Sequence, residues 1–396
     1  MKVVKIILRT LIYTIIIVVV LAASFLVYFT LTDFQPPAAE IIAGENPIGS
    51  IADWDEFSFL TWNVGYCGLD REMDFFYDGG KKVRPSDSSF QNNLNGIFRF
   101  LSEQDSVDFI FLQEVDTLAR RSYYANELKL FSDALPNHIR CFATNYKVRY
   151  VPMPFLNPMG EVISGIATYT RPRPDVSQRY SFPVNYAWPL KLFMPDRCFI
   201  MQRFKCKNRH ELVVINTHNS AFENADVLRQ YEMWMLRSFV LHEYAMGNYV
   251  VLGGDWNENP PGYDSTKYYS CYHKKIGLTQ IPEDYLPKDW HWAYDRKIPS
   301  NRDVDESFRP GLTPTTTIDF FVTSPNVRVE YVKALDRGFE FSDHQPVFMR
   351  IKLETNPLNN CPDDCSKKIS ELRDSIMMFG KKKPGEKPRK KVRKKH

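Results

Sequence analysis

Eight polar residues of the chain share one place in the sequence pattern: each stands at or beside the end of an apolar run, where a buried strand has no use for it. They occur in the motifs TWN, LQE, INTH, GGDWN, TID and SDH, and they are Asn63, Glu114, His218, Asp255, Asn257, Asp319, Asp343 and His344. Loops at strand ends are where α/β folds usually place ligand sites. These residues are therefore candidates for one common site.

The types of these side chains suit the hydrolysis of a phosphate ester. Carboxylate and amide oxygens are hard ligands that favour Mg²⁺ or Mn²⁺. Such a cation offsets the charge that develops on a phosphate in the transition state. The attacking water further needs a base and the leaving group needs a proton donor, and aspartate and histidine serve both purposes.

Taken singly, most of these residues also have a purely structural interpretation. Asn63 suits a turn at a strand end, Asp255 follows two glycines as turn residues do, and His218 fits a hydrogen-bonded core histidine. Glu114 closes a buried strand, where a charge requires either a partner or a metal ion. The joint order of the motifs along the chain is what favours a site.

The elements that position these residues follow from the apolar pattern. Strands are predicted over 56–63, 108–115, 139–145, 162–170, 197–206, 211–218, 248–255, 316–323 and 347–353. Helices are predicted over 89–104, 123–135 and 222–246. Early alternation of strands and helices, followed by hairpins, favours an α/β fold with two mixed β-sheets packed as a four-layer sandwich between helices. The stretch 263–315 is expected to form loops near the site.

An uncharged apolar run from Leu11 to Leu31 precedes the domain. About 20 such residues cross a bilayer as a helix, whereas the apolar part of a cleaved signal peptide has about 7–15. We therefore predict a transmembrane anchor over 11–31, with a cleaved signal as the alternative. Lys2, Lys5 and Arg9 precede the run and the next basic residue is Arg71. By the positive-inside rule, residues 1–10 are cytoplasmic and the large domain is extracytoplasmic, which in a bacterium means periplasmic.

The regions around the domain have compositions of their own. Residues 32–54 are rich in Pro and Gly, which predicts a linker. The domain is expected over 55–354. A short helix is predicted over 366–379, within the region 355–380. The net charge of +4 is uneven, since the tail 381–396 holds ten Lys and Arg against one Glu and leaves −5 on the rest. This tail is expected to be disordered, and either contacts anionic lipid or another polyanion or is simply solvated.

The seven cysteines do not form a disulfide framework, although Cys361 and Cys365 are close enough in sequence either to pair or to stay free. A nucleic-acid-binding protein usually carries its basic excess on the folded face that meets phosphate. Here that excess lies in the tail, which makes nucleic acid a less favoured partner.

The ordered set WN, QE, TH, GDWN, ID and SDH resembles the endonuclease/exonuclease/phosphatase superfamily. That superfamily includes deoxyribonuclease-I-like nucleases, abasic-site endonucleases, neutral sphingomyelinases and inositol polyphosphate 5-phosphatases. The resemblance covers about residues 56–354, and GDWN followed by SDH is its most specific part.

The resemblance implies a cofactor, Mg²⁺ or Mn²⁺, and its ligands. Glu114 is the main metal ligand, Asn63 supports it, and Asp343 is a candidate for a second metal contact. One position departs from the pattern: abasic-site endonucleases carry an Asp two residues after the Asn, where this chain has Gly65. The departure speaks against that activity and leaves Glu114 as the main metal carboxylate.

The resemblance also implies catalytic roles. Asp255 positions or deprotonates the attacking water, Asn257 binds the phosphate, and His218 donates to a phosphoryl oxygen. His344 pairs with Asp319 for acid/base work or for transition-state stabilisation. A carboxylate beside an imidazole fixes its tautomer and supports its charged form, which agrees with such a pair.

Three substrate classes stay open. The first is a lipid or other membrane-proximal phosphodiester, as in the sphingomyelinase branch, and it is favoured by the anchor and by Asn219 after His218. Segments 150–159 and 182–194 are rich in Pro, aromatic residues and Met. They either form an apolar lip for a lipid or are buried connections. A nucleic acid needs a basic, stacking groove. An inositol-phosphate-type monoester needs cations such as Arg171. A non-catalytic binding protein is least favoured, because every motif residue is present.

Overall fold

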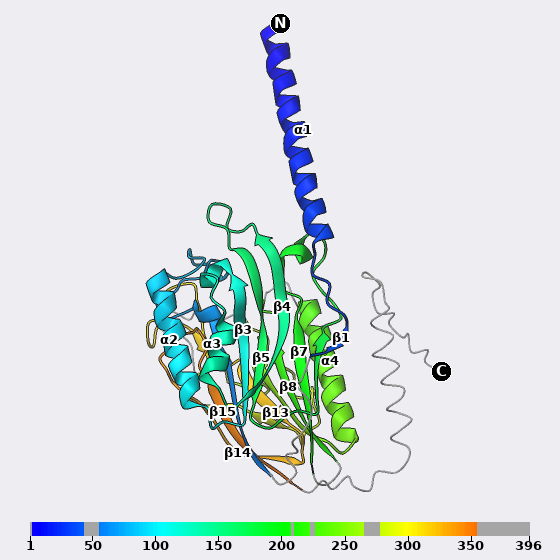
Figure 1. Cartoon of the computed structure of the whole chain (residues 1–396), viewed down its shortest axis with the longest axis vertical. Coiled ribbons are helices and arrows are strands. Elements are labelled where there is room, and N and C mark those ends of the chain that lie inside the picture. The colour runs from blue at the N-terminus through cyan, green and yellow to red at the C-terminus, as the bar shows by residue number, and fades with distance from the viewer. Residues whose placement is uncertain (1, 43–54, 207–209, 222–225, 265–277, 355–396) are drawn as a thin grey trace, which may run out of the picture.

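The computed structural model describes residues 2–42, 55–206, 210–221, 226–264 and 278–354 (Figure 1). Two β-sheets pack face to face, and helices cover their outer faces. The predicted α/β fold with two packed mixed sheets is confirmed. A long N-terminal helix, α1 (Lys2–Leu31), projects away from this body (Figure 1).

The first sheet has six strands and is mixed. Only β2 and β3 pair in parallel, and the other neighbours pair antiparallel. The strands in spatial order are β14 (Val327–Ala334), β15 (Val347–Leu353), β2 (Glu56–Asn63), β3 (Phe109–Ala119), β5 (Gly160–Thr170) and β4 (Ile139–Val151). Helices α2 (Asp87–Glu103) and α3 (Glu127–Ala134) pack on its outer face, and side chains of Ser86 and Asn126 cap their first turns.

The second sheet has seven strands, of which only β8 and β9 pair in parallel. The strands in order are β1 (Ala39–Ile41), β6 (Val176–Ser181), β7 (Cys198–Lys205), β8 (Glu211–His218), β9 (Tyr249–Asp255), β13 (Asp319–Thr323) and β10 (His291–Ala293). Helix α4 (Asp226–Ala245) covers its outer face. Strands β11 (Asn301–Arg302) and β12 (Thr315–Thr316) form a separate antiparallel pair. The short 3₁₀ helices are η1 (Gly65–Cys67), η2 (Phe76–Asp78), η3 (Arg120–Ser122) and η4 (Leu190–Phe193).

Strand alternation divides the core into layers. In β2, Phe57 and Phe59 point between the sheets, while Leu60 and Trp62 point toward the helices. Both faces of this strand are buried, as expected for a strand in a parallel pair inside a sandwich. Phe59 stacks on Phe109 of the neighbouring strand with ring centroids 4.5 Å apart. In this sheet, the face that carries Phe57, Phe59 and Phe109 therefore lies between the two sheets.

Strand polarity brings the polar motif residues to one end of the sandwich. β2 and β3 end together in one sheet, and β8 and β9 end together in the other. The side chains of Asn63 and Asp255, the last residues of β2 and β9, are 2.9 Å apart, so the two pairs end at the same end of the sandwich. The register places His218 opposite Asp255, and Asp255 opposite Asp319. Residues far apart in the sequence therefore become neighbours through pairing alone.

Several elements differ from the sequence predictions. Within the predicted linker 32–54, Ala39–Ile41 pair with β6 as an edge strand. β6 and β14 were not predicted. β6 contains few apolar residues, and the alternation of β14 is short and is interrupted by a bulge between Val329 and Tyr331. α1 begins at Lys2, before the predicted anchor, and is long and apolar enough to cross a membrane by length and composition only. The parts of the predictions that concern residues 43–54, 207–209, 222–225, 265–277 and 355–396 lie outside the described residues.

Candidate functional site

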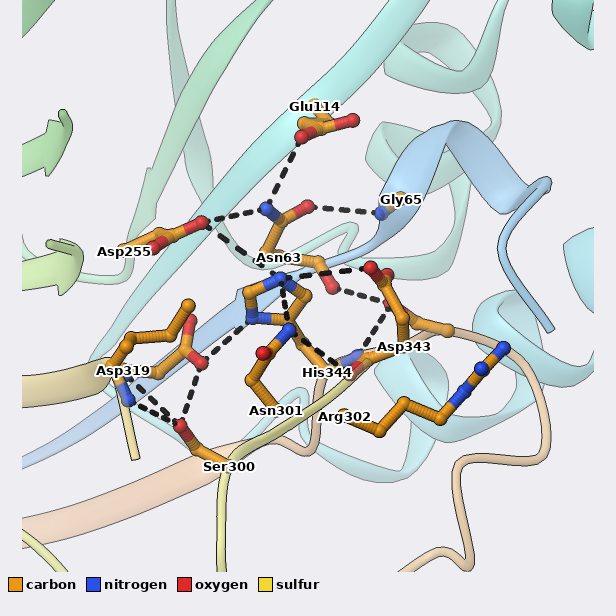
Figure 2. Close-up of polar contacts among 12 residues, drawn as sticks. Asn63, Gly65, Glu114, Asp255, Ser300, Asn301, Arg302, Asp319, Asp343 and His344 are labelled. Atoms are coloured by element: carbon orange, nitrogen blue, oxygen red, sulfur yellow. Dashed lines mark hydrogen bonds and ion pairs between the residues drawn. The ribbon is translucent and has the colours of Figure 1, made fainter. Parts of the chain in front are cut away.

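A cavity of about 220 Å³ opens between the ends of the two sheets. Seven of the eight predicted residues line it, and they are Asn63, Glu114, His218, Asp255, Asn257, Asp343 and His344. The eighth, Asp319, is fully buried and contacts His344 (Figure 2). Residues from both sheets thus meet at one cavity.

His344 and Asp319 form a hydrogen-bonded pair. Nδ1 of His344 lies 2.7 Å from Oδ2 of Asp319, and the Ser300 hydroxyl donates to the same oxygen at 2.8 Å (Figure 2). The backbone N–H of Asp319 donates in turn to the Ser300 hydroxyl at 3.0 Å. The backbone of His344 is held by Trp62, whose indole N–H donates to the His344 carbonyl at 2.9 Å. The imidazole is therefore fixed in position and in tautomer.

The surroundings of His344 favour its charged form. Burial by itself would lower the pKa of His344, but Asp319, Asp343 and Asp255 outweigh burial and raise this pKa well above its ordinary value. Nε2 of His344 lies 3.1 Å from the side-chain nitrogen of Asn301. Carboxylate oxygens of Asp255 and Asp343 lie 3.8 Å and 3.9 Å from the same nitrogen, which favours a proton on it.

His218 has the opposite electrostatic environment. Its side chain is fully buried, and burial, followed by the charge of Arg197, lowers the pKa of His218 well below its ordinary value. Nε2 of His218 lies 3.4 Å from Oδ2 of Asp255 and 3.9 Å from Oε1 of Glu114. Nδ1 has no hydrogen-bond partner among the described residues. His218 is therefore a neutral donor or acceptor near pH 7.

Glu114 is aimed at the cavity by an irregular strand. The β3–β5 register shifts between Leu112 and Val115, and Glu114 has a φ of +56° at this bulge. Such a backbone is costly for a residue with a side chain and is typical of functional positions. Its carboxylate accepts from the Asn63 amide at 3.3 Å, and the same amide donates to Asp255 at 2.9 Å. Asn63 thus joins the carboxylates of the two sheets.

Asn257 is held beside Asp255 by its own strained turn. Its backbone N–H donates to Oδ1 of Asp255 at 3.0 Å, and its φ is +53°. One hydrogen of its side-chain amide goes to the Asn219 carbonyl at 2.9 Å. The intervening Trp256 is core, because it stacks on Phe320 with centroids 4.9 Å apart. The GDWN motif therefore presents its two polar side chains by burying its tryptophan.

Asp343 faces the turn that contains Gly65. A Cβ at Gly65 would lie 3.0 Å from Oδ1 of Asp343, and the φ of Gly65 is +50°. Burial, and then the charge of Glu114 against the opposing charge of His344, set the pKa of Asp343 at about 6, above the usual value. Glycine at this position therefore leaves room for a carboxylate that comes from the SDH motif.

The sequence profile of the endonuclease/exonuclease/phosphatase family matches residues 60–344, which is most of the chain and includes every residue of this cavity cluster. The chain belongs to the endonuclease/exonuclease/phosphatase family. It is accordingly a hydrolase that acts on phosphate ester bonds, and enzymes of this family typically use divalent metal ions.

Solved structures similar to this family member share little sequence with it. An endonuclease/exonuclease/phosphatase from Beutenbergia cavernae is 14% identical, matches 76% of this chain and 72% of its own, and has a TM-score of 0.49. One from Bacteroides vulgatus is 16% identical over 76% of this chain and 99% of its own, with a TM-score of 0.48. TDP2 from Caenorhabditis elegans is 13% identical over 75% and 74%, with a TM-score of 0.46. The curated protein sequences gave no match.

The donor set of this endonuclease/exonuclease/phosphatase family member fits a divalent cation. Glu114, Asp255 and Asp343 all line the cavity, and the last two are buried carboxylates. Burial raises the pKa of Asp255, against the opposing charge of His344, so a cation nearby would relieve a real electrostatic cost. Asp255, Asp319 and His344 also offer ligand atoms within 4.8 Å of one another, but Asp319 and His344 already bind each other. The Glu114–Asp343 side therefore suits a cation better.

The structure brings in residues that sequence reasoning missed. The segment Ser300–Arg302 runs beside the SDH motif. The backbone N–H of Arg302 donates to the Asp343 carbonyl at 3.0 Å, and Asn301 forms an isolated β-bridge with His344. It belongs to the stretch predicted as loops near the site, yet no apolar run marks it. Arg197 also lines the cavity and precedes β7, and its half-buried guanidinium has no ion-pair partner among the described residues. The only signal was its position as the first residue of the predicted strand 197–206.

Two predicted substrate-binding residues are not brought to the cavity. Arg171 is at the opposite end of β5, where it pairs with Asp108 at 3.4 Å and donates to the Ser106 carbonyl. Asn219 is fully buried, accepts from the Thr217 hydroxyl, and directs its amide at the Met233 sulfur. Antiparallel pairing sends the end of β5 away from the cavity, and the role left for Asn219 is to hold Asn257 through its carbonyl.

Proposed function

We propose that the chain is a membrane-anchored, extracytoplasmic phosphodiesterase that acts on a lipid or another membrane-proximal phosphodiester, with Mg²⁺ or Mn²⁺ as its cofactor. The observation that carries the proposal is one segment, 182–197, which contacts both the anchor helix and the cavity. Phe193 packs against Phe29 of α1 with centroids 5.3 Å apart, and the following Met194 and Arg197 line the cavity. A site built next to a membrane-spanning helix meets substrates at the membrane surface.

The basic residues before α1 support the proposed orientation. Lys2, Lys5 and Arg9 lie at the start of the helix, and the chain has no Lys or Arg between its end and Arg71. This asymmetry is typical of a cytoplasmic N-terminus and an extracytoplasmic domain.

The residues of the cavity divide the proposed reaction between them. Glu114 and Asp343 would hold the cation, with Asn63 as a further ligand once its amide turns its oxygen away from Gly65. A cation held there neutralises charge on a non-bridging phosphate oxygen. Asp255 lines the same cavity and would take the proton of the attacking water, a task for which a raised pKa is suited.

The two histidines act on different oxygens of the phosphate. Neutral His218 donates an N–H to a phosphoryl oxygen, and the free hydrogen of the Asn257 amide joins it. Protonated His344 gives its Nε2 proton to the leaving oxygen as the P–O bond breaks, while Asp319 stabilises the ring. Water thus supplies the new P–O bond, and the leaving group departs as an alcohol.

A substrate panel with the full-length protein in detergent and Mg²⁺ tests the proposal. It contains sphingomyelin, phosphatidylinositol phosphates, bis(p-nitrophenyl) phosphate and plasmid DNA. We expect cleavage of a lipid phosphodiester and of the soluble diester. Cleavage of plasmid alone would overturn the lipid proposal and favour an extracytoplasmic nuclease.

Arg197 favours a second candidate, a phosphomonoesterase for inositol-phosphate-type head groups. The guanidinium lines the cavity, and two other cavity arginines are engaged: Arg121 with Asp116 and Arg302 with backbone carbonyls. An available cation suits a second phosphate on the substrate. Release of inorganic phosphate without cleavage of any diester in the panel would favour this candidate.

A further inference from the structure

Exposed apolar side chains gather at the end of the domain from which α1 leaves. They lie on the β4–β5 turn and on the segment before β7, and we call them the apolar platform: Met153, Phe155, Leu156, Trp188 and Leu190. Phe155 is 85% exposed and Leu156 is 94% exposed, values that a side chain with a partner in its own chain does not have. The platform therefore needs an occupant.

We infer that the platform rests in the surface of the same bilayer that α1 crosses, and so holds the catalytic cavity against that bilayer. The inference rests on the proposed membrane anchor and deepens the proposed lipid substrate class. The occupant is the lipid interface, because the platform adjoins the one described helix that is long and apolar enough to cross a membrane.

Strand direction places the platform at the catalytic end of the sandwich. β4 runs parallel to β3 and β2, because β5 is antiparallel to both β3 and β4. The β4–β5 turn therefore lies at the same end as Asn63. β6 runs parallel to β8 for the same reason, so the segment after β6 lies at the same end as His218. Figure 1 shows the β4–β5 turn rising at the end from which α1 departs.

Direct contacts fix the anchor against this end. Trp188 donates its indole N–H to the Thr30 hydroxyl at 3.1 Å, and Lys191 pairs with Asp33 at 2.9 Å. Edge strand β1 then ties the chain after α1 to β6. The anchor is thus attached without a free spacer, and the domain has a set orientation relative to the helix axis.

The β4–β5 turn has the polarity of a membrane-surface element. Its tip, 152–159, contains no charged residue. Below the tip, Lys147, Arg149 and Tyr150 are exposed, at the level where head groups would lie. Apolar tips with tryptophan, tyrosine and basic residues behind them are typical of interfacial anchors, whereas a protein partner requires no such order.

The platform and the cavity share their walls. Met159 closes the β4–β5 turn by donating its backbone N–H to the Met153 carbonyl, and the Met159 side chain lines the cavity. Met194, at the end of the segment before β7, also lines the cavity. A lipid head group at the platform therefore lies beside the catalytic residues.

A pair of tryptophan substitutions tests the contact in the full-length protein reconstituted into phosphatidylcholine vesicles with brominated acyl chains. Leu156→Trp places the probe on the platform. Met246→Trp, at a side chain 50% exposed beyond the far end of α4, is the matched control. We expect extra bromine quenching for Leu156→Trp only. Equal quenching in the two variants would overturn the inference.

Turnover gives an independent test with the variant Phe155→Ser/Leu156→Ser. The catalytic efficiency on a vesicle phosphodiester should fall about fivefold or more, because the orientation of the site at the bilayer is lost, while bis(p-nitrophenyl) phosphate is cleaved as by the wild type. Unchanged efficiency on both substrates would contradict the inference.

The two proposals fail in different ways. Wild-type protein that does not float with vesicles overturns the anchor and the platform together. Protein that floats and shows the quenching difference, yet cleaves no phosphodiester, overturns the proposed function and leaves the platform standing.

Discussion

At the scale of single residues, the two histidines of the cavity have opposite charge states. Asp319, Asp343 and Asp255 overcome the effect of burial and raise the pKa of His344, whereas burial and the charge of Arg197 lower the pKa of His218. Pairs of titratable groups whose environments separate their pKa values are typical of acid/base sites. This contrast supports the proposed roles of His344 as proton donor and His218 as neutral donor.

Asp319→Asn should move the alkaline limb of the pH profile to lower pH. The raised pKa keeps His344 protonated over the neutral range, so activity that needs this proton falls only as pH rises through that pKa. Removing the carboxylate lowers the pKa and brings the fall to lower pH, with a loss of roughly 10²–10⁴-fold in rate at neutral pH. The measurement is kcat/KM against pH on a soluble diester. An unmoved limb would exclude His344 as the donor.

Glu114→Gln should remove turnover while the protein stays folded. The neutral amide keeps the shape of the side chain but loses the charge that favours a divalent cation, and we expect at least about 10²-fold lower kcat. Arg171→Ala is the matched control, because Arg171 lies away from the cavity and pairs with Asp108. Near-normal kcat in the Glu114 variant, measured beside an unchanged melting temperature, would contradict the assigned metal site.

At the scale of elements, the strand ends carry the site through unusual backbone conformations. Gly65, Glu114 and Asn257 all have positive φ values just at or after the ends of regular pairing. At Gly65 and Asn257 the chain turns away from its strand, whereas at Glu114 the strand bulges and then continues to Ala119. The short segment Ser300–Arg302 then closes the cavity by pairing against the SDH motif.

Gly65→Ala should destabilise the turn after β2 more than its conformation alone explains. The new Cβ would lie 3.0 Å from Oδ1 of Asp343, and we expect a loss of about 1–3 kcal/mol in the free energy of unfolding. Gly338→Ala is the control, because Gly338 has a φ of +61° and nothing within 4 Å of the added Cβ. Urea unfolding in detergent measures both. Equal losses would mean that Asp343 tolerates the methyl group.

At the scale of the whole molecule, the two sheets bring acidic groups together at one end. Burial raises the pKa of Asp255 to about 7 against the opposing charge of His344, and burial likewise raises the pKa of Asp343 to about 6. A folded state with raised carboxyl pKa values binds more protons than the unfolded chain. Its stability from these groups is present at low pH and is lost as pH rises through about 6 to 7.

Mg²⁺ should therefore stabilise the protein more at pH 8 than at pH 5. At pH 8 the carboxylates are charged and bind the cation, with a gain of about 2.7 kcal/mol at a Mg²⁺ concentration of roughly 100 times Kd. At pH 5 protons compete for the same oxygens. Melting temperatures with and without EDTA measure the difference. Glu114→Gln should lose the gain and Arg171→Ala should keep it, and a gain that does not depend on pH would contradict the acidic site.

The sequence by itself determined the element types and the residues with chemical potential. Strands such as 56–63 and the helix over 89–104 were predictable because alternation and helical spacing are local properties. The motif residues were visible because a polar side chain at the end of an apolar run is a local contrast. Strands β6 and β14 were missed because half-exposed strands carry little such contrast.

Only the tertiary structure decided which of these residues meet. Strand direction placed Arg171 at the end of the sheet away from the cavity and Arg197 at the cavity. Long-range pairing set Asn301 beside His344. The tertiary packing also directed the Asn219 side chain into the core and placed Phe193 of segment 182–197 against Phe29 of α1. The physical reason is that register and strand direction are set by pairing between distant segments, so no local pattern records the distance between two side chains.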